Sequence, residues 1–274
     1  MSSPAAPPDF DPVSSLLAGL GLSAAELYGC RQERKLVVAP ATAAALRDAV
    51  AVALPREEWS PGRARTLIHT VYLDTPDFAL YQRCMARGPA PSLKLRVRAY
   101  GGAATPDRPD AAQFFEAKLG VTTPAGERIK QKARFALTPE QLSALFCGRL
   151  DPTEKALRKP WQGLFAYVAA FEVRPRLTVS YVREAFVDPA AGLRITFDRD
   201  YRATALDGAA TPLSRAAVSL GDAVIVEIKL VDALPGWLAE ALAAHELPLD
   251  GQRFSKYKTA VPLLFPHVSQ RTDA

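Results

Sequence analysis

The chain has 274 residues, of which 49% are hydrophobic and 23% charged, and its formal net charge is +5 at pH 7. This length suits one main domain, the balance of apolar and charged residues excludes a largely disordered chain, and no apolar stretch is long enough to span a bilayer. A modest positive charge fits a nucleic acid, an anionic lipid or an acidic small molecule, so the positions of the charges matter more than their sum.

The N-terminal part of the chain predicts a flexible leader. Residues 1–28 are rich in Ala, Pro and Ser, with one short helical turn expected at 14–20 and without the basic and apolar segments of a secretory signal. Cys30, Cys84 and Cys147 are widely spaced, which favours thiols in a reducing cytoplasm over disulfides or a metal site. We therefore expect a cytoplasmic protein.

Short segments in which apolar and polar residues alternate follow the leader and predict strands. They cover residues 31–39, 66–74, 92–100, 113–119, 127–137, 176–187, 193–201 and 223–230. The connections at 123–126 and 188–192 contain Pro and Gly and are short enough for hairpins. Together these features predict a mainly β, α+β fold, in which eight antiparallel strands form a closed β-barrel.

Segments between the strands are predicted to be helical, at 42–54, 138–148, 154–170 and 235–246. The second has the sequence of a capping box, with Thr138 as the N-cap, Pro139 at the first helical position and Gln141 three residues after the cap. The apolar faces of the helices need a partner, and the apolar side of the strands supplies one. Helices packed outside the barrel would turn the charged side of the strands into its lumen.

The charged side of the strands is the main functional signal. In SLKLRVRAY, residues 92–100, apolar and basic side chains alternate, which is typical of a strand with one apolar and one cationic face. The same alternation gives charged faces that carry Glu33 and Lys35, Glu116 and Lys118, Arg194 and Asp198, Glu227 and Lys229 and, less cleanly, Arg183. For any one strand a solvent-facing side is the simpler interpretation. Cations on nearly every strand, with helices on the apolar side, favour an enclosed cationic lumen.

Such a lumen needs water or an anion, because unpaired buried cations are costly. Arg and Lys side chains suit a chain of phosphates. Carboxylates among them suit a divalent cation, Mg²⁺ or Mn²⁺, because such an ion is held by one or two carboxylates together with phosphate oxygens. Glu227 is the first candidate to hold this metal, followed by Glu33, Glu116 and Asp198.

The ordered segments ERK, VYLDTPDFALY, LKLRVRAYG, FFEAKLG, IKQKARF, RPRLTVSYVREAF, LRITFD, VIVEIKL and FSKY resemble the VTC (vacuolar transporter chaperone) domain. This domain belongs to the CYTH-like, triphosphate tunnel metalloenzyme superfamily. The resemblance covers residues 29–265, leaves 266–274 as a C-terminal tail, and looks like the stand-alone bacterial form. It implies an eight-stranded tunnel and an ATP-dependent polyphosphate polymerase, which passes the terminal phosphoryl group of a nucleoside triphosphate to a polyphosphate chain.

The resemblance also implies roles for single residues. Those expected to carry the reaction are Lys35, Arg96, Arg98, Lys118, Arg183, Arg194 and Lys256. The residues further expected to bind phosphate are Lys94, Lys130, Lys132, Lys229 and Ser255, of which Lys132 and Ser255 match motifs of the family. Hydrolytic CYTH enzymes typically open with E-x-E-x-K, whereas this chain reads RQERK, so Arg31 stands in place of the first glutamate. This departure disfavours a hydrolytic metal site with several acids.

Three activities fit the sequence. The first is the polymerase, the second is a triphosphatase of the same fold that uses water as acceptor, and the third is a non-catalytic binder of polyphosphate or nucleotides. The expected partners are ATP and polyphosphate, and the oligomeric state is left open. Nucleic acid is not expected as a partner, since the basic strands lack the interleaved exposed aromatic residues of a stacking surface.

Overall fold

The computed structural model describes residues 32–57, 64–86, 92–101, 113–122, 128–151, 159–214, 216–252 and 254–269. For residues 121–122, 128–131 and 159–162 it describes the backbone alone. The predicted leader, the connection at 123–126 and the start of the helix predicted at 154–170 lie outside the described residues. No helix in the described part of the chain is both long and apolar enough to cross a membrane.

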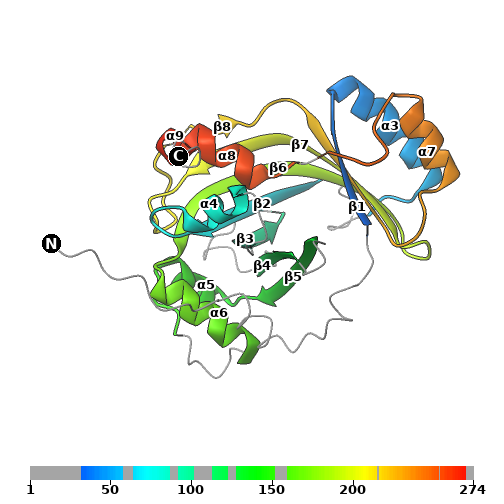
Figure 1. Cartoon of the computed structure of the whole chain (residues 1–274). Helices are drawn as coiled ribbons and strands as arrows, with labels where there is room; N and C mark the ends of the chain where they lie inside the picture. The colour runs from blue at the N-terminus through cyan, green and yellow to red at the C-terminus, as the bar shows by residue number, and fades with distance from the viewer. Residues whose placement is uncertain are drawn as a thin grey trace.

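One antiparallel sheet forms the centre of the molecule (Figure 1). Its strands are β1 (Gln32–Val38), β2 (Thr66–Asp74), β3 (Ser92–Tyr100), β4 (Gln113–Thr122), β5 (Arg128–Ala136), β6 (Arg174–Asp188), β7 (Leu193–Ala205), β8 (Val218–Ser219) and β9 (Val224–Leu230). The strands follow the order β1-β9-β7-β6-β2-β3-β4-β5, and β8 pairs with β7. All eight predicted strands are present, and the hairpin predicted at 188–192 joins β6 to β7, where Asp188 pairs with Leu193.

The sheet curls but does not close. β1 and β5 end the strand order, and within the described ranges they do not pair with each other. The prediction of a closed eight-stranded barrel is therefore wrong in two respects, because the sheet is an open half-barrel and has β8 as a ninth strand. Alternation of side chains specifies which face of a strand is apolar. Closure depends on hydrogen bonds between the first and last strands, which alternation does not specify.

Helices cover the apolar, outer face of the curled sheet. α5 (Pro139–Phe146) and α6 (Lys159–Ala170) pack on β3 and β4, while α3 (Pro40–Ala53) and α7 (Gly236–Ala243) pack on β1, β7 and β9. Figure 1 shows these two pairs of helices at separate parts of the sheet. The predicted capping box of α5 is confirmed, since Thr138 Oγ1 accepts a hydrogen bond from Gln141 N at 3.2 Å and Gln141 Oε1 accepts one from Thr138 N at 3.1 Å.

Three further helices were not predicted: α4 (Ala79–Met85), α8 (Lys256–Leu264) and α9 (Pro266–Ser269). α8 packs on the inner face of the sheet, where its Tyr257 and Val261 share an apolar core with Tyr72 and Leu177. The expectation that the helices pack outside the sheet is wrong for α8. One end of the inner face is therefore apolar and covered, and the charged residues occupy the rest of it.

A buried carboxylate, Asp74, ties α8 to the sheet. Asp74 Oδ1 accepts hydrogen bonds from the N–H groups of Thr75 at 2.8 Å and Leu80 at 2.9 Å, and Asp74 Oδ2 accepts one from Tyr81 N–H at 2.9 Å. The Thr75 hydroxyl also donates to Oδ1, at 3.3 Å, and the Tyr257 hydroxyl donates to Oδ2. Because Asp74 is fully buried, these bonds replace all of its contact with water. Strand β2, helix α4 and helix α8 are thereby joined at one point.

We expect Tyr257→Phe to lower the free energy of unfolding by about 1–3 kcal/mol, because a buried carboxylate loses one donor while the ring packing stays. Urea denaturation followed by circular dichroism measures this loss. Tyr201→Phe is the matched control, since the Tyr201 hydroxyl is buried and has no hydrogen-bond partner within the described part of the structure. An equal loss in the two variants would contradict the role of the Asp74 hydrogen bond.

Candidate functional site

The strand register places the predicted side chains on one face of the sheet, because directly paired residues in an antiparallel sheet point to the same side. We call this side the inner face. On β3, β4 and β5 the pairs are Arg96 with Glu116, Glu116 with Arg134, Lys94 with Lys118, and Lys118 with Lys132. On β6, β7, β9 and β1 the pairs are Arg183 with Asp198, Arg194 with Lys229, Glu227 with Lys35, and Lys229 with Glu33. Strand β2 joins the two halves, since Thr70 pairs with Arg98 and Thr66 with Arg183.

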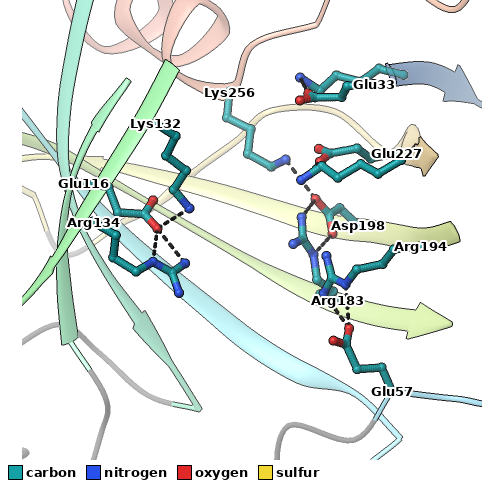
Figure 2. Close-up of polar contacts among 12 residues, drawn as sticks. Glu33, Glu57, Glu116, Lys132, Arg134, Arg183, Arg194, Asp198, Glu227 and Lys256 are labelled. Carbon is teal, nitrogen blue, oxygen red and sulfur yellow. Dashed lines mark hydrogen bonds and ion pairs between the residues drawn. The ribbon is translucent and has the colours of Figure 1, made fainter. Parts of the chain in front are cut away.

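Glu116 is the centre of one cluster on the inner face (Figure 2). Arg96 donates to its Oε2, with Nε at 2.7 Å and a terminal nitrogen at 2.6 Å. Arg134 donates to its Oε1 from two nitrogens at 2.9 and 2.7 Å, and Lys132 Nζ lies 2.5 Å from the same oxygen. The side chain of Glu116 is 0% exposed, so these three cations form its polar surroundings.

The electrostatics of this cluster favour a permanently charged carboxylate. Burial opposes ionisation of Glu116, but the charges of Arg96, Arg98 and Lys132 outweigh it and hold the pKa of Glu116 far below its ordinary value. Burial lowers the pKa of Lys132 to about 8, although the Glu116 carboxylate acts in the opposite direction. Glu116 therefore stays an anion at neutral pH and fixes the positions of the surrounding cations.

Asp198 is the centre of a second cluster. Arg183 donates to both of its oxygens, from Nε at 2.6 Å and from a terminal nitrogen at 2.7 Å, and Lys256 Nζ donates to Oδ2 at 2.9 Å. Burial alone would raise the pKa of Asp198, but Arg183 and Lys256 outweigh it, so the pKa is lowered. Lys256 also lies over the Tyr181 ring, 4.4 Å from its centroid. Asp198 thus holds the guanidinium group of Arg183 and the ammonium group of Lys256 beside each other on the inner face.

Ser255 and Lys256 reach this face because α8 begins there. Ser255 is the N-cap of α8, and its Oγ accepts a hydrogen bond from Lys258 N at 3.4 Å. Lys94 Nζ on β3 donates to the same oxygen at 3.3 Å. The FSK segment that carried the resemblance thus has a local structural function, since the serine starts the helix and thereby positions Lys256.

Two carboxylates lie on the neighbouring strands β1 and β9. Within each strand the carboxylate forms an ion pair: Glu33 with Lys35 on β1, and Glu227 with Lys229 on β9, where the nitrogen and oxygen are 2.7 Å apart. Burial and the charge of Glu227 raise the pKa of Glu33, but the charges of Lys35 and Lys118 outweigh them, so its pKa is lowered. Burial would raise the pKa of Glu227, but Lys229, Arg183 and Lys35 hold it well below its ordinary value. Lys118 on β4 contributes to the lowered pKa of Glu33 on β1, so the inner faces of these two parts of the curled sheet lie towards each other.

Three predicted cations on the inner face lack a carboxylate within 4.0 Å among the residues described: Lys94, Arg98 and Lys118. Arg98 is 7% exposed, and its Nε donates to Thr70 Oγ1 at 3.4 Å. Burial, and then the charge of Arg96, lower the pKa of Lys118 well below its ordinary value. An anionic ligand on the inner face would supply the negative charge that these side chains lack.

Sequence reasoning missed two residues of the site, Arg134 and Glu57. Arg134 lies two residues after Lys132 in KARF and therefore on the same face of the strand, so the alternation test could have found it. Glu57 accepts hydrogen bonds from Arg194 at its Oε2, from Nε at 2.7 Å and from a terminal nitrogen at 2.6 Å. It follows a helix and lies in no predicted strand, so the sequence offers no comparable signal for it. Arg31 lies outside the described residues, as does the side chain of Lys130.

The site and fold define a class of protein with a curled antiparallel sheet and a charged inner face rich in Lys and Arg. Residues 30–265 match the family model of the VTC domain, and the chain belongs to this family. Membership supports an activity on polyphosphate or on triphosphates, as the resemblance indicated. None of the curated proteins matches the chain.

Several solved structures are similar to this one, and two of them are described here. The first is the putative adenylyl cyclase HpAC1 from Hippeastrum, which is described as having a dominant triphosphatase activity. The two sequences are 15% identical, the match covers 85% of this chain and 96% of that chain, and the TM-score is 0.47. The second is the PH1819 protein from Pyrococcus horikoshii OT3, with 13% identity, coverage of 79% and 86%, and a TM-score of 0.36.

Proposed function

We propose that the protein is a metal-dependent polyphosphate polymerase that uses a nucleoside triphosphate, with ATP as the expected donor. A terminal oxygen of a polyphosphate chain attacks the γ-phosphorus, and a new P–O–P linkage forms. The bond from the γ-phosphorus to the bridging β,γ-oxygen breaks, and its electron pair stays on that oxygen. The products are a nucleoside diphosphate and a polyphosphate chain longer by one phosphate.

The observation that carries this proposal is the composition of the inner face. Cations outnumber carboxylates there: Lys35, Lys94, Arg96, Arg98, Lys118, Lys132, Arg134, Arg183, Arg194, Lys229 and Lys256 stand against Glu33, Glu57, Glu116, Asp198 and Glu227. Glu116 and Asp198 are each surrounded by two or more cations and leave little room for further charge pairing. The surplus positive charge matches a ligand with many phosphates.

In phosphoryl transfer a protein mainly positions groups and offsets charge. We assign Arg96, Arg98, Arg183 and Arg194 to gripping phosphate oxygens, because a guanidinium group can donate two parallel hydrogen bonds. We assign Lys35, Lys118, Lys132 and Lys256 to offsetting the charge of the transferred group and the acceptor chain. Lys94, Lys130, Lys229 and Ser255 stay predictions as further phosphate contacts.

The residues present fit a divalent cation, Mn²⁺ or Mg²⁺, at Glu33 and Glu227. These carboxylates lie on neighbouring strands, and the buried Thr196 hydroxyl, directly across from Glu227, has no hydrogen-bond partner in the described parts of the chain. The described residues contain no group of three or more His, Cys, Asp or Glu side chains able to hold a metal, so phosphate oxygens would complete the shell. When bound, the ion offsets negative charge on the phosphate oxygens. Asp198 and Glu116, also predicted as metal ligands, are better placed to position cations.

One assay tests the proposed function against its alternatives. Purified protein is incubated with ATP, Mn²⁺ and a short polyphosphate primer, and the products are separated. Long-chain polyphosphate with nucleoside diphosphate supports the polymerase, and free phosphate alone supports a triphosphatase of the same fold. Tight binding of ATP without turnover supports a non-catalytic binder.

In this assay we expect Arg98→Ala to lower activity by about 10- to 100-fold, because charge-assisted hydrogen bonds to phosphate are lost. Stability should change little, since Arg98 has no carboxylate partner in the described part of the sheet and Glu116 keeps its direct contacts with Arg96, Lys132 and Arg134. Arg47→Ala on the outer helix α3 removes the same charge away from the site and serves as the control. Full activity of the Arg98 variant would contradict the assignment.

A further inference from the structure

Glu57 enters the inner face from outside the predicted strands. Residues 55–57 run beside the end of β6: Glu57 N donates to Ala185 O at 2.8 Å, and Val187 N donates to Pro55 O at 3.1 Å. Arg56 pairs with Phe186 in this short bridge, and Phe186 belongs to the outer core under α3 and α7. Neighbouring residues of an extended segment point to opposite sides, so Glu57 points to the inner face.

Glu57 holds Arg194 less firmly than Glu116 and Asp198 hold their cations. Both nitrogens of Arg194 that contact it donate to one oxygen, Oε2. Glu57 is 26% exposed and has a single cation partner among the residues described. Glu116 and Asp198, by contrast, are 0% exposed and each holds two or more cations. Glu57 can therefore turn towards water without becoming a buried unpaired anion, and a phosphate that takes its place would keep the Arg194 side chain, which is 15% exposed, paired with a negative charge.

We propose that Glu57 is a built-in competitor for the phosphate ligand: its carboxylate occupies Arg194 in the unliganded protein, and a phosphate group must displace it. The inference rests on the proposed function, in which the inner face binds a chain of phosphates. A carboxylate and a phosphate accept hydrogen bonds from the same guanidinium nitrogens, so one excludes the other. The displaced carboxylate also stays close to the bound ligand and repels it. Glu57 thus weakens phosphate binding and makes release of the chain easier.

The opposite sign is expected if Glu57 only orients Arg194. In that case its removal frees the guanidinium group and weakens binding. Glu57→Gln separates the two ideas, because glutamine keeps an oxygen that accepts from Arg194 but loses the negative charge. The competitor predicts tighter binding in Glu57→Gln, and the orienting role predicts equal or weaker binding.

The test is calorimetric titration of the whole chain with inorganic tripolyphosphate. We expect Glu57→Gln to bind about two- to fivefold more tightly than the unaltered protein, the size of effect that a partly exposed ion pair gives. Glu57→Ala should show a gain in the same direction and guards against an effect special to glutamine. Asp48→Asn, which removes a carboxylate paired with Arg47 on α3, is the matched control and should not change the affinity.

A double variant completes the design. In an Arg194→Ala background, Glu57→Gln should no longer raise the affinity for tripolyphosphate, because the guanidinium group for which Glu57 and phosphate compete is absent. If the unaltered protein binds tripolyphosphate and Glu57→Gln binds no more tightly, the competitor role is overturned while the proposed function stands. If none of the proteins binds tripolyphosphate, the proposed function is overturned and the inference with it. An equal gain in Asp48→Asn would reduce the effect to net charge and would overturn the competitor role too.

Discussion

Glu116→Gln is expected to lower the free energy of unfolding by about 3–5 kcal/mol, the effect of removing one partner of a buried ion pair. Glutamine has nearly the same shape as glutamate, so the loss comes from charge. Arg96 is the critical partner, because its side chain is 10% exposed and both of the nitrogens that it offers to a carboxylate contact Glu116. Without the carboxylate, three converging cations repel one another.

Arg134→Ala is the matched comparison. It removes one of the three cations and leaves Glu116 with Arg96 and Lys132. Because Arg134 is 34% exposed, its loss should change the free energy of unfolding by about 1 kcal/mol or less. Urea denaturation of both variants at pH 7 measures the difference. Equal losses would show that Glu116 does not organise the cluster.

Acid should distinguish the Glu116 variant further. The folded-state pKa of Glu116 is depressed, whereas the carboxyl of the unfolded chain titrates near its ordinary value of 4.5. The unfolded state therefore binds the proton first, and the stabilisation by Glu116, complete above this value, is lost as the pH falls below it. Glu116→Gln lacks this contribution, so its stability should fall less steeply than that of the unaltered protein between pH 5 and 3, a range set by the same pKa shift. Parallel curves would contradict this account.

The placement of the inner-face cations could be predicted from sequence because a strand has a side-chain period of two. SLKLRVRAY fixes Lys94, Arg96 and Arg98 on one side of β3 whatever the neighbouring strands do. The apolar side is fixed equally well, since Leu95 and Val97 pack in the core under α5 and α6. The sequence of a single segment is therefore enough to predict that it forms a strand and which of its residues lie on the inner face.

The contacts between side chains on different strands could not be predicted from the sequence. Alternation places Glu116 on the inner face but does not show that Arg96 and Arg134 lie beside it, because that depends on the register of three strands. The metal role predicted for Glu116 from its residue type stays a prediction. The sequence also does not show that the sheet stays open, because pairing of β1 with β5 depends on the curvature of the whole sheet.

The helix α8 shows a different limit. It begins with Lys256, Tyr257 and Lys258 and contains Pro262, so no simple apolar stripe marks it as a core helix. Its apolar partners lie on the inner face, where charged residues were expected. The Ser255 cap and the Tyr257 hydrogen bond to Asp74 hold it there. Tertiary contacts with distant residues therefore decide the position of this helix, as they do for Glu57 beside Arg194.

The second large effect concerns Glu227. Glu227→Gln should lower polymerase activity by about 100-fold or more at a fixed Mn²⁺ concentration, because loss of a ligand weakens metal binding and with it the offset of phosphate charge. The carboxylate is ionised at neutral pH, since Lys229, Arg183 and Lys35 hold its pKa well below the ordinary value despite burial. Activity is measured as polyphosphate formed from ATP over a range of Mn²⁺ concentrations.

The metal dependence separates a ligand role from a purely structural one. If Glu227 holds the ion, the variant needs more Mn²⁺ to reach half of its own maximum, whereas loss of local structure would lower the maximum without moving that concentration. Glu240→Gln, an exposed carboxylate on α7, is the control for removal of one negative charge and should behave like the unaltered protein. An unchanged Mn²⁺ requirement in Glu227→Gln would contradict the assignment of the metal to Glu227 on β9. Glu33, one strand further on, would then be the carboxylate to test, since its pKa is also lowered and it also faces Lys118.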